Sequence, residues 1–160
     1  MRLSEWRATA PSKDAASTKV LAVLEPVLES LGAGRDPECW IHWGDDPGVR
    51  WTLLAPTPAG LVEANVRVSV PGEGPRVAAK LVRWSRVQIG DLAVESQGGH
   101  RFVSLQVEGI VLRGVDAEAD RITAFVRRLL DAVDGRGVPE TGTAATAVAG
   151  RRGRAMPARD

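Results

Sequence analysis

The sequence predicts a mainly β domain of the α+β class, in which about seven short antiparallel strands lie between two helices. Two apolar stripes of helical spacing, over residues 12–31 and 117–133, predict the helices. Alternation of apolar and polar residues between them predicts the strands. The length of 160 residues fits one domain, and a content of 44% hydrophobic and 26% charged residues is typical of globular proteins.

Both ends of the chain lack such a period. We expect residues 1–11 to form a flexible N-terminus and residues 135–160 a disordered basic tail, because neither segment offers an apolar face to bury. The tail has a formal charge of +3 and the rest of the chain −2. A net charge of only +1 disfavours nucleic acid as a partner, since such binding needs a strong positive field.

An N-terminal helix is predicted over residues 12–33, with Ser12 as its N-cap and Gly32 as its terminator. Pro26 removes one backbone donor inside this segment, so we expect a kink or a break near Glu25. The stripe that this helix buries consists of Val20, Leu24, Val27, Leu28 and Leu31.

The clearest strand covers residues 62–70, where apolar and polar residues alternate without a break, which is typical of a half-buried strand. Residues 77–89 form a longer β segment that we expect to be bent or interrupted around Ser85. The other strands are predicted at residues 39–43, 49–55, 92–96, 101–107 and 110–113.

A C-terminal amphipathic helix is predicted between Asp116, its expected N-cap, and Gly135, which ends it. An open antiparallel sheet leaves free edges and a bare apolar face, so we expect the strands to form a barrel that this helix closes. Its apolar stripe consists of Ile122, Phe125, Val126, Leu129, Leu130 and Val133.

The stretch Trp-Thr-Leu-Leu-Ala-Pro-Thr-Pro-Ala-Gly-Leu-Val at residues 51–62 resembles a leucine-rich strand, threonine-containing turn and following strand of bacterial pleckstrin-homology (PH)-like domains. Residues 84–89 are similar to their middle segment and residues 119–133 to their closing helix. The resemblance covers residues 39–134 and implies a PH-like seven-stranded antiparallel barrel. It does not extend to inositol lipids, because Asp45 and Asp46 stand where lipid-binding members place basic residues. A helix-grip fold of the lipid-transfer type is the second choice.

The sequence carries no pattern typical of an enzyme, a metal site or a cofactor site. Cys39 and His42 lie three residues apart, which on a strand places them on opposite faces, and zinc needs converging ligands. No serine elbow, dinucleotide fingerprint or phosphate-binding loop is present, so we expect a protein without catalytic activity, metal or cofactor. The chain shows neither a secretory signal nor an apolar run of spanning length, which predicts a cytoplasmic protein.

The candidate binding residues are Trp40, Arg67, Lys80, Arg83 and Arg86. We expect Trp40, opposite Ile41 and Trp43, to pack under the N-terminal helix or to contact a ligand. The four basic residues would hold an anion or an acidic partner if they share a face; otherwise they form a solvated face.

Three functions are compatible with these residues. We expect first a binding or adaptor module, in which a protein or peptide segment pairs with an edge strand beside the closing helix, with Trp40, Arg83 and Arg86 in contact. The first alternative is a binder of an anionic membrane surface or lipid headgroup, using the four basic residues and the tail. The second alternative is a small-molecule or lipid carrier with a helix-grip fold.

Overall fold

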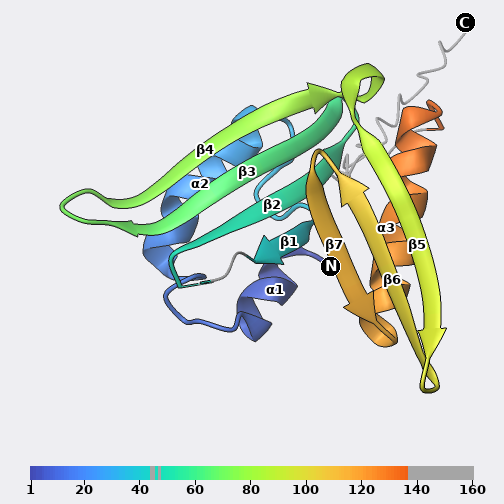
Figure 1. Cartoon of the computed structure of the whole chain (residues 1–160). Coiled ribbons are helices and arrows are strands. Elements are labelled where there is room, and N and C mark those ends of the chain that lie inside the picture. Colours follow the sequence, from blue (N-terminus) through green and yellow to red (C-terminus); the bar gives the residue numbers. More distant parts are fainter. Residues whose placement is uncertain (44–45, 47, 137–160) are drawn as a thin grey trace, which may run out of the picture.

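The computed structural model describes residues 1–43, 46 and 48–136 (Figure 1). The helices in this part of the chain are α1 (Leu3–Thr9), α2 (Thr18–Ser30), the short 3₁₀ helix η1 (Trp84–Arg86) and α3 (Ala117–Val133). The strands are β1 (Trp40–Trp43), β2 (Arg50–Thr57), β3 (Gly60–Val70), β4 (Gly74–Arg83), β5 (Ile89–Gln97), β6 (His100–Val107) and β7 (Ile110–Val115).

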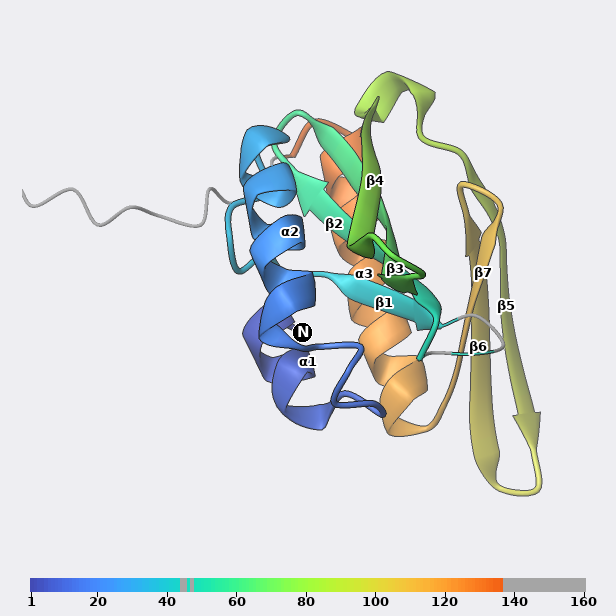
Figure 2. The same cartoon turned by 90° about the vertical axis from the view of Figure 1, so that its left-hand side faces the viewer.

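The strands form two antiparallel sheets rather than one closed barrel. Sheet 1 has the order β1-β2-β3-β4 and sheet 2 the order β5-β6-β7. The mainly β class, the seven strands and the interruption near Ser85 are therefore confirmed, but the closed barrel is not found. Barrel closure would need β4 and β5 to pair, but η1 separates them and they belong to different sheets. Figure 2 shows the two sheets apart, with helices beside them.

One core lies between sheet 1 and the helices α1 and α2. Trp6 of α1 and Leu24 of α2 pack there with Trp51 and Leu53 of β2. Our expectation that residues 1–11 lack regular structure is wrong, because α1 buries Leu3 and Trp6. A helix of two turns is too short to show a period in the sequence, and its position is fixed by contacts with the segment before β1.

Helix α2 begins later than predicted but ends where predicted. Its N-cap is Ser17, whose Oγ accepts a hydrogen bond from the Val20 N–H, so Ser12 is not the cap. Gly32 follows the helix with a φ of 81°, and Ala33 N–H donates to Leu28 O at 2.9 Å, which is the Schellman arrangement. The helix continues through Pro26 without a break.

A second core lies between α3, sheet 2 and the other face of sheet 1. Ile122 and Leu129 of α3 pack with Leu105 of β6, and Trp40 packs near Phe125 with ring centroids 6.1 Å apart. Trp40 therefore does not pack under the N-terminal helix, since strand alternation turns it towards α3. The stripe of α3 is also narrower than predicted: Leu130 and Val133 are exposed.

Sheet 1 is thus covered on both faces over part of its length. In β3, residues 60–64 are buried without alternation, and alternating burial begins only at Asn65. The predicted half-buried strand at residues 62–70 is therefore correct for its second half alone. Its first half lies where the two cores meet across the sheet.

Asp116 precedes α3, but its carboxylate does not cap the helix. Oδ1 accepts a hydrogen bond from the Arg101 N–H at 3.0 Å, and Oδ2 lies 2.7 Å from His100 Nδ1. The backbone hydrogen bond from Arg101, followed by the contact with His100, lowers the pKa of Asp116. With its φ of 50°, the residue instead ties the start of β6 to the start of α3.

Candidate functional site

The outer edge of β1, along which no described strand pairs, is the strongest candidate for a binding site. The N-terminal segment pairs with the residues just before β1: Leu3 N–H donates to Pro37 O at 3.0 Å and Cys39 N–H donates to Met1 O at 2.8 Å. Backbone groups of alternate residues in a strand point to the same edge. Ile41 and Trp43 therefore direct their N–H and C=O groups outward, and no described backbone group pairs with them there.

An aromatic pocket of about 280 Å³ lies beside this edge, between α1, β1 and α3. Trp6 and Trp43 line it, with ring centroids 5.4 Å apart, and Phe125 lines it from α3. Glu118 and Arg121, both exposed on α3, add one charge of each sign. The pocket therefore offers an apolar wall with a polar rim, which is the usual form of a recognition site.

Trp6 also brings a buried donor that has no partner. Its side chain is 3% exposed, and its indole Nε1 has no hydrogen-bond acceptor among the described residues. A buried N–H without an acceptor costs about 1–3 kcal/mol. By contrast, Trp51 Nε1 in the same cluster donates to Ala15 O at 3.3 Å. The pocket wall thus holds one donor whose hydrogen bond is unmade.

Cys39 lines the pocket without being a nucleophile. Its thiol is buried, and this desolvation raises its pKa to about 12. The thiol therefore stays protonated near neutral pH, and a thiol is far less reactive than a thiolate. No group of three or more possible metal-ligating side chains occurs among the described residues.

The structure separates the basic residues that the sequence singled out. Lys80 of β4 pairs with Glu63 of β3, so the two side chains lie on the same face of sheet 1. Arg67 lies on that face too, because it follows Glu63 by four residues on β3. Arg83 pairs with Gly60 and therefore lies on the opposite face, and Arg86 is exposed in η1. The four residues do not share one face.

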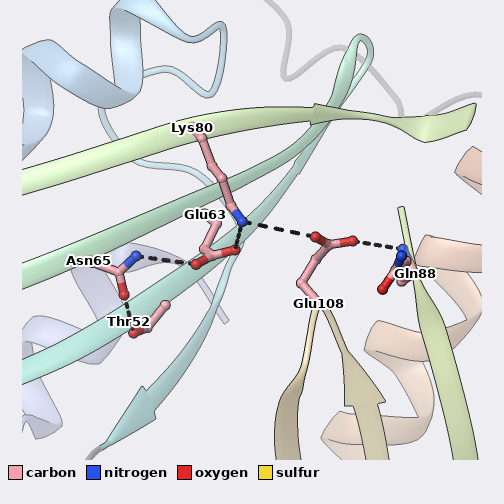
Figure 3. A network of polar contacts seen from close by, with 6 residues as sticks. All are labelled: Thr52, Glu63, Asn65, Lys80, Gln88 and Glu108. Atoms are coloured by element: carbon pink, nitrogen blue, oxygen red, sulfur yellow. Dashed lines mark hydrogen bonds and ion pairs between the residues drawn. The ribbon is translucent and has the colours of Figure 1, made fainter. Parts of the chain in front are cut away.

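Lys80 belongs to a polar network that joins the two sheets (Figure 3). Its Nζ lies 2.9 Å from Glu63 Oε2 on β3 and 4.0 Å from Glu108 Oε2 in the β6–β7 turn. Glu108 Oε1 accepts a hydrogen bond from the Gln88 N–H at 2.7 Å. The hydrogen bond to Glu63 raises the pKa of Lys80. Lys80 is thus committed to a structural link and is not free for a ligand.

The same network continues along the face of sheet 1. Asn65 Nδ2 donates to Glu63 Oε1 at 3.2 Å, and Thr52 Oγ1 donates to Asn65 Oδ1 at 2.8 Å. Glu108 holds a φ of 51°, an unusual value for a residue with a side chain. Its carboxylate contacts explain why a glutamate occupies this turn.

Sequence reasoning identified Trp40, which lines the pocket but is only 8% exposed, and missed Trp6 and Phe125 as pocket residues. Phe125 was predicted only as part of the helix stripe. Leu3 and Trp6, three residues apart, were the one helical signal in the N-terminal segment.

No family model, curated protein or solved structure matches this chain. Its class is therefore defined by its own fold: over the described residues it is a mainly β protein of two antiparallel sheets, with helices before the first strand and after the last. Among the described residues, no helix combines the length and the apolar character needed to cross a membrane.

Proposed function

We propose that this protein is a non-enzymatic binding module that takes up an extended peptide segment as an additional strand along β1. The observation that carries the proposal is the outer edge at Ile41 and Trp43, which has no main-chain partner among the described residues and lies beside the aromatic pocket. Strand addition needs unpaired main-chain groups for affinity and pockets for alternate side chains for specificity, and both occur here.

The chain itself supports strand addition at this edge. Arg2 and Glu38 form an antiparallel bridge, so a short extended segment already pairs with residues 37–39. After Leu3 the chain turns into α1, and no backbone group of the described residues pairs with the rest of the edge. A partner strand would continue the pairing from that point, between α1 and α3.

The pocket indicates what the partner segment carries. A volume of about 280 Å³ is near the lower limit of sites for small molecules, about 300 Å³, and suits one large apolar side chain. Trp6 Nε1 would gain an acceptor if a peptide carbonyl reached it after a small shift of the ring. Glu118 and Arg121 favour polar residues on either side of the apolar one.

For the fold we propose that the relation to bacterial PH-like domains holds, since seven strands followed by a C-terminal helix have the order of those domains. A cytoplasmic location is part of the same proposal.

Of the candidate binding residues, Trp40 contributes to the wall of the aromatic pocket.

The test begins with selection of short linear peptides from a display library on the full-length protein. Amide hydrogen exchange is then measured by NMR with and without a selected peptide. We expect the Ile41 and Trp43 amides, which have no described hydrogen-bond acceptor, to exchange more slowly in the complex than in the free protein. Protection confined to β5 or β7, or a library without binders, would contradict the proposal.

A matched pair of variants locates the site. Ala124 is an exposed residue of α3 that lines the pocket, so Ala124→Arg fills it without disturbing a core. We expect it to weaken peptide binding by about tenfold or more, which is about 1.4 kcal/mol. Ala22→Arg, an exposed position on α2, is the control and should leave affinity unchanged. Equal affinity in both variants would place the peptide elsewhere.

A further inference from the structure

Three arginines lie in one row across sheet 1. The register places Arg50 of β2 directly opposite Arg67 of β3, and Arg67 directly opposite Arg76 of β4. Residues paired in this way share a face of the sheet, and neighbouring strands lie about 4.8 Å apart, so the row spans about 10 Å. All three side chains are exposed.

This row is unfavourable for folding by itself, because like charges directly opposite one another on a sheet are destabilising. Arg76 has a weak partner in Glu73 at 3.8 Å, with both side chains mostly exposed. Arg50 and Arg67 form no ion pair within the described part of the chain. Glu63 lies four residues before Arg67 on β3, and its carboxylate pairs with Lys80, which also lies 4.0 Å from Glu108, rather than with the arginines of the row.

An open hollow adjoins the row. It has a volume of about 440 Å³ and is lined by Arg50 and Arg67, with the hydroxyl-bearing Ser69 and one acidic residue, Asp46. Guanidinium groups present planar, paired N–H donors that match the oxygens of an anion. The hollow therefore holds two guanidinium groups, those of Arg50 and Arg67, and no described acidic side chain forms an ion pair with either.

We propose that this row binds a ligand through a phosphate group held between Arg50 and Arg67, with Arg76 contributing from the third strand. A phosphate has enough oxygens to offer a separate pair to each of two guanidinium groups, whereas a carboxylate has only two oxygens, both of which one bidentate guanidinium group already uses. The proposal concerns a different set of residues from the β1 edge and does not depend on peptide binding there.

The test uses NMR titration of the full-length protein with inorganic phosphate and pyrophosphate at low ionic strength, where screening is weak. We expect shifts of the signals of Arg50, Arg67 and Arg76. Arg67→Gln should weaken binding by about tenfold or more. Arg127→Gln, which removes an exposed arginine of α3 outside the row, should change the affinity less than about twofold. Arg67→Lys should bind more weakly than the native protein, because lysine keeps the charge but loses the paired donors.

Sedimentation with vesicles distinguishes the source of the phosphate group. Binding to vesicles that contain phosphatidic acid, together with weak binding of free phosphate, would assign the row to a lipid headgroup; the reverse would assign it to a soluble ligand. In both arms Arg67→Gln must weaken binding. The proposal is overturned if no phosphate compound binds, if binding is insensitive to Arg67→Gln, or if only a poly-glutamate peptide binds. A thermal melt of Arg67→Gln separates loss of binding from loss of fold: the variant removes a repulsion and should melt no lower than the native protein.

Discussion

Replacing Gly60 by alanine is expected to open the end of sheet 1 at the β3–β4 ladder. A Cβ at this position would lie 2.2 Å from Val82 O, 2.9 Å from Val82 C and 3.0 Å from Arg83 Cα. Ordinary contacts of a Cβ begin at 3.4 Å, and all three atoms belong to the backbone of β4. The two strands would therefore have to separate by more than about 1 Å.

The cost follows from the contacts that this movement disturbs. Overpacking of a filled site costs about 1–3 kcal/mol, and a lost hydrogen bond adds about 1 kcal/mol. The hydrogen bond at risk is the one that Thr57 Oγ1 donates to Gly60 O at 2.8 Å. In the same turn, Thr57 O accepts a hydrogen bond from Trp84 Nε1. We expect a destabilisation of about 2–4 kcal/mol and a fall in Tm of about 6–12 °C.

Urea unfolding followed by tryptophan fluorescence measures this difference. Gly90→Ala is the matched control, because its Cβ would meet only the flexible side chain of Gln106, at 3.0 Å and beyond. Its expected effect is within about 1 kcal/mol of the native protein. A Gly60→Ala protein within about 0.5 kcal/mol of the native protein, or an equal loss in the control, would refute the reasoning.

Two further predictions concern ionisable groups. Lys80→Met should destabilise the protein by about 1–2 kcal/mol at neutral pH, because the buried Glu63 loses its cation; the cost is less than for a fully buried pair since Lys80 is half exposed. The fold raises the pKa of Lys80 above 10.5. The stability difference between the native protein and Lys80→Met should therefore be fully present below pH 10.5 and shrink as the pH rises further. Urea midpoints of both proteins across this pH range measure the difference. Cys39, with a pKa of about 12, should react with a disulfide reagent at pH near 8 only as fast as the chain unfolds; rapid labelling of the folded protein would contradict its burial.

Periodicity predicted the strands because each face of a strand leaves its own trace in the sequence. It did not predict the two sheets, because the alternation of apolar and polar residues is the same in one barrel as in two sheets. The difference depends on where the chain turns, and η1 directs β5 away from β4. Alternation placed Trp40 on the correct face, opposite Ile41, but could not say whether α2 or α3 covers that face.

The candidate sites were predicted only in part for the same reason. The sequence favoured pairing with an edge strand beside the closing helix without indicating which strand, and Trp6 lies in a helix of two turns whose burial depends on distant contacts. Arg50, Arg67 and Arg76 have no common spacing in the sequence. They become neighbours only through the register of three strands, which a single sequence does not encode in any visible pattern.

Because sheet 1 separates the two cores, adjacent positions of β2 report on different halves of the molecule. Leu53 is buried with α1 and α2, whereas Leu54 is buried with α3 and sheet 2. A pair of fluorine labels at these two consecutive residues would therefore act as independent sensors on opposite faces of one strand. If the N-terminal helices detach while α3 stays docked, the first label alone would change its signal, and the order in which the layers come apart could be followed in a single sample.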